Sequence, residues 1–263
     1  MQAVTGVFLS KHDAIAAVEK LRAMNVVDER ITLLTPGDER KEENLVSTDA
    51  GEAPGVGKAL GAVVGAAGGL SGGSMLVAAM VPGIGMVTAA GLLGASILGA
   101  AGAAIGAAAG ASLDNRFSEG LPEDEIFVYE DALRKGRSVV VVFSDDSSGA
   151  ERVRDALKSA RAEAIDDARH QWWIGLRSAE QEHYSAAGGN FGTDEKFYRL
   201  GFEEALHSRM RCKEFDQVSA EMESRLEELQ KKYPGEDITE AYTRGYQRGR
   251  EYYQRFCDQT KAA

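Results

Sequence analysis

The pattern of hydrophobic and polar positions divides the chain into three stretches. Residues 1–54 mix short apolar runs with charged positions, and residues 114–263 do the same. Between Lys58 and Asp114 there is no charged residue, and Gly, Ala, Leu, Val, Ile and Met make up almost the whole stretch. Because charged side chains are seldom fully buried without a partner, a long stretch without them predicts an apolar environment.

The two flanks of the apolar stretch predict similar elements. The first flank predicts a strand, a helix and a strand, at residues 4–9, 11–24 and 30–34. The second predicts a helix, a strand, a helix and a short strand, at residues 121–135, 138–143, 150–160 and 162–165. Two split βαβ halves of this kind, 1–54 and 114–166, predict an α+β fold: a ferredoxin-like sandwich.

Small residues recur at every fourth position within residues 55–113, which places them on one face of a helix. This spacing predicts a glycine-zipper hairpin with transmembrane helices at 59–80 and 85–112 and a turn at Val81–Gly85. The expected helix-packing positions are Gly57, Gly61, Gly65, Gly69, Gly73, Gly94, Gly102, Gly106 and Gly110.

The hairpin interrupts the sandwich, so both soluble halves are expected on one side of the membrane. The N-terminus shows no basic segment followed by an apolar run, which predicts no cleavable signal. The expected location is the cell inner membrane, with the soluble domains facing the cytoplasm and the lipid bilayer as a partner. The alternative is a hairpin buried at the centre of an oligomer.

Residues 167–263 are highly charged and predict an all-α C-terminal module with an internal repeat. The pattern Tyr-x-x-Gly-aromatic-x-x-small begins at Tyr198 and again 44 residues later at Tyr242. On a helix, the tyrosine, the glycine and the small residue lie along one stripe. The repeat predicts two helices that cross at Gly201 and Gly245. An aromatic cage or ligand cleft is the functional alternative.

Charge and motifs limit the chemistry that is expected. The net charge of −11 argues against general nucleic-acid binding, which needs a basic face. Two Glu-x-x-His strings, at Glu180–His183 and Glu204–His207, match part of a di-iron carboxylate pattern, although a solvated charged face is the favoured explanation because such strings arise easily in a Glu-rich stretch. We therefore expect no enzyme, no catalytic residue, no cofactor and no metal, and a small-molecule ligand stays unknown. Trp172 and Trp173 predict either an interfacial anchor or a core position.

The first 166 residues resemble the bacterial heat-induced general stress protein family. The resemblance lies in Val7-Phe8, in the helix and strand from Ala14 to Leu34, in the Gly/Ala-rich insertion, and in Tyr129–Gly136 before the strand Val139–Phe143. It implies an association with the stress response and supplies no catalytic residue. The helical C-terminal module departs from the short members of that family.

These features predict a membrane-anchored, self-associating stress-response protein with a structural or regulatory role. A homo-oligomer is expected, because a regular glycine ladder implies specific helix packing. The first alternative is an oligomeric pore or conductance regulator built from the zipper hairpins. The second is a ligand-binding, metal-binding or enzymatic function of residues 167–263.

Overall fold

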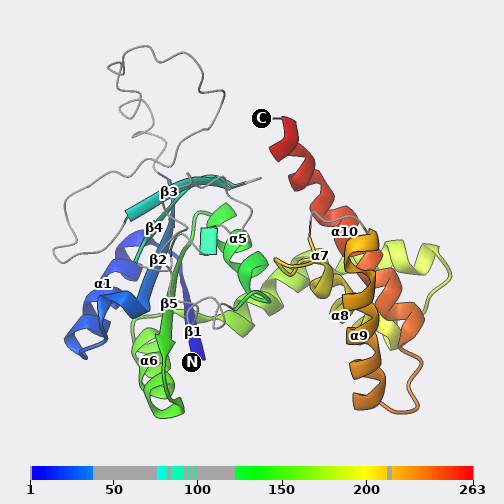
Figure 1. The fold of residues 1–263 in the computed structure, drawn as a ribbon, viewed down its shortest axis with the longest axis horizontal. Coiled ribbons are helices and arrows are strands. Elements are labelled where there is room, and N and C mark those ends of the chain that lie inside the picture. Colours follow the sequence, from blue (N-terminus) through cyan, green and yellow to red (C-terminus); the bar gives the residue numbers. More distant parts are fainter. Residues whose placement is uncertain are drawn as a thin grey trace. The chain divides into compact units, whose positions relative to one another are not determined.

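A computed structural model describes residues 2–37, 76–81, 84–91, 94, 97–98, 122–211 and 215–262 of the chain. The chain forms two compact units (Figure 1). Unit 1 comprises residues 1–122 and 128–169, and unit 2 comprises residues 123–127 and 170–263.

Unit 1 is built on a six-stranded antiparallel sheet with the strand order β3-β4-β2-β5-β1-β6. The strands are β1 (Gln2–Phe8), β2 (Ile31–Pro36), β3 (Leu76–Val81), β4 (Gly85–Ala90), β5 (Ser138–Ser144) and β6 (Glu163–Ala164). Helix α1 (Lys11–Ala23) connects β1 to β2, and α6 (Ser147–Ser159) connects β5 to β6. The four strands β2-β5-β1-β6 with these two crossovers have the split βαβ arrangement.

The sequence explains where both crossover helices begin and which face they bury. Ser10 caps α1 by accepting a hydrogen bond from the Asp13 amide, and Asp146 caps α6 by accepting one from the Gly149 amide at 2.6 Å. Their apolar stripes pack on one face of the sheet, against Val4, Phe8, Leu33, Val140 and Val142. Thr5 points to the other face and is hydrogen-bonded to Tyr129 of α5 (Ile126–Arg134) at 2.9 Å.

The predicted transmembrane hairpin is wrong where the structure describes it. Residues 76–81 and 85–90 are not parts of two helices but form the β-hairpin β3–β4, which extends the sheet beyond β2. Within the described ranges, every helix is too short or too polar to cross a bilayer. The remaining parts of the two proposed spans lie outside the described residues, apart from Gly91, Gly94, Ile97 and Leu98.

The error has a physical origin. A short apolar run does not by itself distinguish a buried strand from a buried helix. Here Val81, Val87 and Ala89 are buried within a sheet, so the absence of charge reflects burial in protein. Strand β3 ends at Val81, and Gly85, with a φ of +99°, opens a strand and not a helix. The membrane and glycine-zipper interpretation is therefore not retained.

Unit 2 contains four helices among its described residues, in two consecutive pairs. We name the pair α7 (Ile165–Ala186) and α8 (Phe191–Ala205) hairpin A. The pair α9 (Phe215–Lys232) and α10 (Thr239–Ala262) is hairpin B. Each connection contains a glycine with positive φ, Gly188 at +85° and Gly235 at +86°, where a side chain would strain the backbone.

Candidate functional site

Helices α8 and α10 cross at the two glycines of the internal repeat. A Cβ atom on Gly201 would overlap the carbonyl oxygen of Tyr242, and one on Gly245 would overlap that of Tyr198. Tyr242 and Tyr198 are themselves equivalent residues of the repeat. The contact is therefore reciprocal, as it is around a two-fold axis. The structure thus brings Gly201 and Gly245 together in one crossing.

A buried ion pair joins hairpin A to hairpin B on one side of this crossing, and we name it network A. Glu180 of α7 is only 2% exposed. Its carboxylate accepts hydrogen bonds from Arg248 Nε at 3.0 Å, from Arg248 Nη2 at 3.2 Å and from the Tyr198 hydroxyl at 2.8 Å. Arg248 also bonds the exposed Glu251 at 3.2 Å. Both carboxylate oxygens of Glu180 are thereby satisfied.

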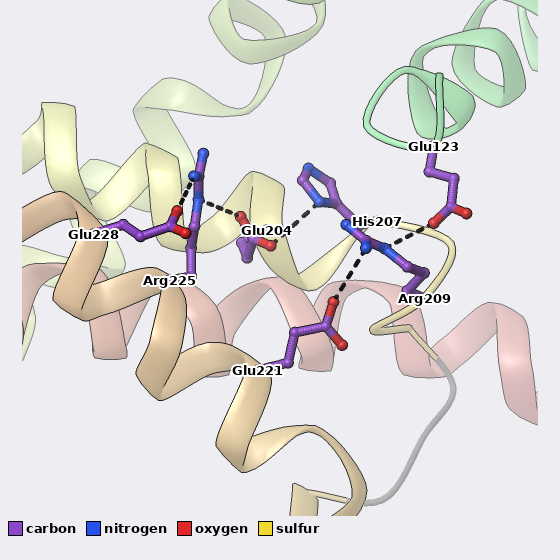
Figure 2. A network of polar contacts seen from close by, with 7 residues as sticks. All are labelled: Glu123, Glu204, His207, Arg209, Glu221, Arg225 and Glu228. Carbon is purple, nitrogen blue, oxygen red and sulfur yellow. Dashed lines mark hydrogen bonds and ion pairs between the residues drawn. The ribbon is translucent and has the colours of Figure 1, made fainter. Parts of the chain in front are cut away.

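A second polar network, network B, lies between α8 and α9 (Figure 2). Glu204 of α8 is 3.3 Å from His207 Nδ1 and 3.4 Å from Arg225 Nε of α9. Arg225 Nη1 is bound to Glu228 at 2.8 Å. Arg209 Nε lies 2.9 Å from Glu123 and Arg209 Nη1 lies 3.6 Å from Glu221. Network B therefore surrounds one nearly buried carboxylate with cationic groups.

The two networks occupy equivalent positions with their charges reversed. Arg248 stands in the repeat where Glu204 stands, because each directly precedes the small residue that ends the eight-residue pattern. Glu180 and Arg225 lie 45 residues apart, one off the 44-residue repeat, but each is on the first helix of its hairpin and each pairs with the position 204 or 248 of the other hairpin. In network A the first helix of a hairpin, α7, carries the carboxylate, and the second helix of the other hairpin, α10, carries the guanidinium. In network B the first helix, α9, carries the guanidinium, and the second helix of the other hairpin, α8, carries the carboxylate.

The hydroxyl groups of the two halves differ in their bonding. Tyr198 donates to Glu180, whereas the buried hydroxyls of Tyr242 and Tyr246 have no hydrogen-bond partner among the described residues. A guanidinium at the place of Glu180 can donate to a tyrosine oxygen but cannot accept its proton, so the bond that Tyr198 donates has no counterpart of the same direction at Tyr242. Tyr246 occupies the position of Phe202 in the repeat, so its hydroxyl has no counterpart in hairpin A.

Electrostatic surroundings shift the titration of these groups away from neutral pH. Burial acts to raise the pKa of Glu204, but its hydrogen bond with His207 and the charges of His207, Arg225 and Arg209 lower that pKa overall. Burial raises the pKa of Tyr198, and its bond to Glu180 adds to the effect. Burial likewise raises the pKa of Tyr246 to about 12. At pH 7 the carboxylate of Glu204 is thus charged and the tyrosines are neutral.

The two Glu-x-x-His strings do not form one metal site. Glu180 belongs to network A and Glu204 to network B, and each carboxylate is bound by a different arginine. The described residues hold no group of three or more His, Cys, Asp or Glu side chains placed to bind a metal ion. The di-iron hypothesis therefore finds no support in the part of the chain that the structure describes.

The tandem tryptophans occupy core positions of unit 2. Trp172 packs against Phe127 with ring centroids 4.8 Å apart, and Trp173 is 2% exposed. Trp173 Nε1 donates to Glu195 at 3.0 Å, and Arg177 binds the same carboxylate through two bonds of 2.7 and 2.6 Å. The core interpretation is confirmed, because both indole rings are buried and pack against other aromatic rings of unit 2.

A cavity of about 250 Å³ opens beside network A, and its lining includes His183, Tyr184, Arg244 and Arg248. The guanidinium of Arg244 lies 5.3 Å from the centroid of the Tyr184 ring and pairs with Glu240 at 2.6 Å. Both arginines that line the cavity are already neutralised by carboxylates. This arrangement gives an incoming anion little net attraction.

Sequence analysis found the glycine crossing but not the arginines that flank it. Arg225 and Arg248 pair with the buried carboxylates of Glu204 and Glu180, and comparing the charges within the repeat, Glu204 against Arg248, is a signal that could have revealed Arg248. Of the predicted ladder, only Gly94 is described: it is buried, and a Cβ there would overlap Ala89 of β4. The other eight ladder positions lie outside the described residues.

Comparisons with known proteins leave the chain without an assigned family. No family model, curated protein or solved structure matches it. The resemblance of residues 1–166 to the heat-induced stress proteins therefore stays an expectation from the sequence.

Proposed function

We propose that this protein is a non-catalytic, self-associating protein with a structural or regulatory role, and that unit 2 is its association module. The observation that carries the proposal is the reciprocal crossing of hairpins A and B, in which buried charges join helix to helix. Helices of different chains pack by the same ridge-and-groove geometry as helices of one chain, so a crossing of this kind is compatible with association.

The protonation behaviour of the buried groups supports a role without turnover. A general acid or base works best when its pKa lies near the working pH. In unit 2 the shifts run the other way, since the pKa values of Glu195 and Glu204 are lowered and those of Tyr184, Tyr198, Tyr242 and Tyr246 are raised. These shifts move the pKa values of the six side chains away from neutral pH.

The stress-response part of the proposal rests on the resemblance of residues 1–166 alone. Its test is the abundance of the protein before and after a heat shock, with a rise expected. The pore alternative is not proposed, because residues 76–81 and 85–90 of its supposed spans are strands.

Self-association is tested by light scattering coupled to size-exclusion chromatography over a wide range of protein concentrations. We expect the measured mass to rise above that of one 28.1 kDa chain as the concentration increases. A mass of one chain at every concentration would overturn the proposal.

A further inference from the structure

A second cavity, of about 300 Å³, opens in unit 1 between the turn that follows α1 and the start of α6. Its lining includes Met24, Val26, Val27, Arg152 and Val153. The volume is at the lower end of the range for ligand pockets, roughly 300 to 1,000 Å³, which suits a small ligand. Every residue that lines the cavity belongs to unit 1, so the cavity is separate from the crossing and from both networks.

One wall of this cavity is apolar and extends from the core of unit 1 to the surface. Val153 is buried in that core, and Val26 packs against it. Met24 and Val27 continue the wall outward, with 39% and 51% of their surface exposed. Exposed apolar side chains that adjoin one another beside a pocket favour an apolar ligand, because binding removes their surface from water.

The turn that carries this wall is held in a fixed conformation. Asn25 follows the last residue of the α1 cap with a φ of +63°, and the Val26 amide donates to the Leu21 carbonyl at 3.1 Å, as in a Schellman motif. Arg22 Nε donates to the Asp28 carboxylate at 2.6 Å and ties the next residues to the helix. A wall formed in advance loses little conformational freedom when a ligand binds, which favours affinity.

The polar side of the cavity presents a guanidinium without a carboxylate in contact. Arg30 is paired with Asp145, and the Asp146 carboxylate accepts hydrogen bonds at the start of α6. Among the described residues, Arg152 forms no ion pair, and its Nη1 donates to the Ser148 hydroxyl at 3.3 Å. The cavity beside network A differs in this respect, because both of its arginines are paired with carboxylates.

From this geometry we infer that the cavity of unit 1 binds a small molecule with an apolar body and one carboxylate, which contacts Arg152. The apolar wall receives the body of the ligand, and a guanidinium offers parallel N–H donors that match the two oxygens of a carboxylate. The nearby carboxylates of Asp145 and Asp146 disfavour a dianion such as phosphate. The inference concerns unit 1 alone and goes beyond the proposed self-association.

The test uses the full-length protein with phenylacetate as the probe and its uncharged amide, phenylacetamide, as the matched ligand. Dissociation constants are measured by ligand-observed NMR titration. We expect phenylacetate to bind roughly fivefold to tenfold more tightly than the amide, the gain of a charge-assisted hydrogen bond near the protein surface. Inorganic phosphate should not displace phenylacetate.

Two arginine variants locate the contact. Arg152→Gln should weaken the binding of phenylacetate to the level of the amide and leave the binding of the amide unchanged. The control is Arg154→Gln, which removes an exposed charge from the same helix outside the cavity and should change neither affinity. Val27→Asp, which places a charge in the apolar wall, should weaken the binding of both ligands. The three replaced side chains are exposed, so the variants should keep the thermal stability of the wild type.

The inference would be overturned if phenylacetate bound no more tightly than its amide, or if Arg152→Gln and Arg154→Gln bound it equally well. Displacement of phenylacetate by inorganic phosphate would overturn the assigned class of ligand. A protein that binds phenylacetate as expected but stays monomeric at every concentration would support this inference and overturn the proposed function, so the two results are independent.

Discussion

Hairpins A and B both bring a glycine into close contact with the backbone of the other hairpin, but they differ in the side chains that pack around this contact. Hairpin A packs rings around its tyrosine, with Tyr184 and Phe191 at centroid distances of 4.9 and 5.6 Å from Tyr198. The core around the equivalent Tyr242 is largely aliphatic and includes Val218, Leu229 and Ile238. The close approach of the backbones is thus common to both halves, and the surrounding side chains distinguish one half from the other.

This difference separates two physical roles. A glycine contact fixes how near two helices lie, and any large residue is excluded there whatever its chemistry. The charges fix which surface is accepted, because opposite charges attract and like charges repel across the same geometry. If this division holds, changes at the glycines should damage both halves alike, whereas changes in the networks should affect each half differently.

The largest effect is expected at the crossing. Gly201→Ala and Gly245→Ala each place a Cβ atom on a backbone carbonyl that cannot move without displacing its helix. Each change should lower the free energy of unfolding by about 3 kcal/mol or more, the upper end of the range for over-packing a core. Thermal unfolding followed by circular dichroism is the measurement, and the two variants should lose similar amounts.

The control for both glycine variants is Gly175→Ala in α7. No atom lies within 4 Å of a Cβ built at this position, so the only consequence is the higher helix propensity of alanine. This variant should be more stable than the wild type by up to about 1 kcal/mol. Equal stability of all three variants would mean that the crossing is not closely packed.

The crossing also shows what the sequence alone can predict. An eight-residue repeat identified Gly201 and Gly245, because a four-residue step on a helix has one geometric meaning. The strand at Ser138–Ser144 was likewise predictable, since its run of valines is confined to strand length and ends at a turn. Both predictions depend on local spacing.

The four-residue spacing of small residues led to a wrong prediction of helices where the chain forms the strands β3 and β4. Leu76–Val81 and Gly85–Ala90 carry no charge and lie between two four-residue glycine ladders, yet they pair with each other, and Gly85–Ala90 pairs with β2. Strand pairing is decided by residues distant in the sequence, which no local pattern records. The bond from Arg248 to Glu180 was missed for the same reason, because its partners are 68 positions apart.

The next effect in size compares the two buried carboxylates. Glu180→Ala leaves the guanidinium of Arg248 without its buried partner and should destabilise unit 2 by about 3 kcal/mol. Glu204→Ala should cost less, about 1 to 2 kcal/mol, because its contacts of 3.3 and 3.4 Å are longer and Arg225 keeps Glu228. Urea unfolding measures both. A larger loss of unfolding free energy for Glu204→Ala than for Glu180→Ala would mean that network B stabilises the fold more than network A does.

Acid titration provides a third comparison. Because the pKa of Glu204 is lower in the folded protein than its ordinary value of 4.5, the charged form favours folding. This contribution is fully present above pH 4.5 and is lost as the pH falls through the folded value. Glu204→Gln should therefore show a shallower loss of unfolding free energy below pH 4.5 than the wild type does. Parallel curves would show that Glu204 titrates alike in both states.

The smallest effect is expected when the hydroxyl group is removed from each of two equivalent tyrosines, and the change in unfolding free energy should differ in sign between the two variants. Tyr198→Phe removes a hydroxyl that is bonded to Glu180 at 2.8 Å, so it should lower the free energy of unfolding by about 1 kcal/mol. Tyr242→Phe removes a buried hydroxyl with no partner among the described residues, and the loss of an unsatisfied polar group should be neutral or stabilising. The two substitutions delete the same atom from equivalent positions at one crossing, so packing changes cancel in the comparison. Urea unfolding of both variants gives the result. A loss for Tyr242→Phe as large as that for Tyr198→Phe would mean that the charge-reversed half satisfies its hydroxyl as well as the first half does.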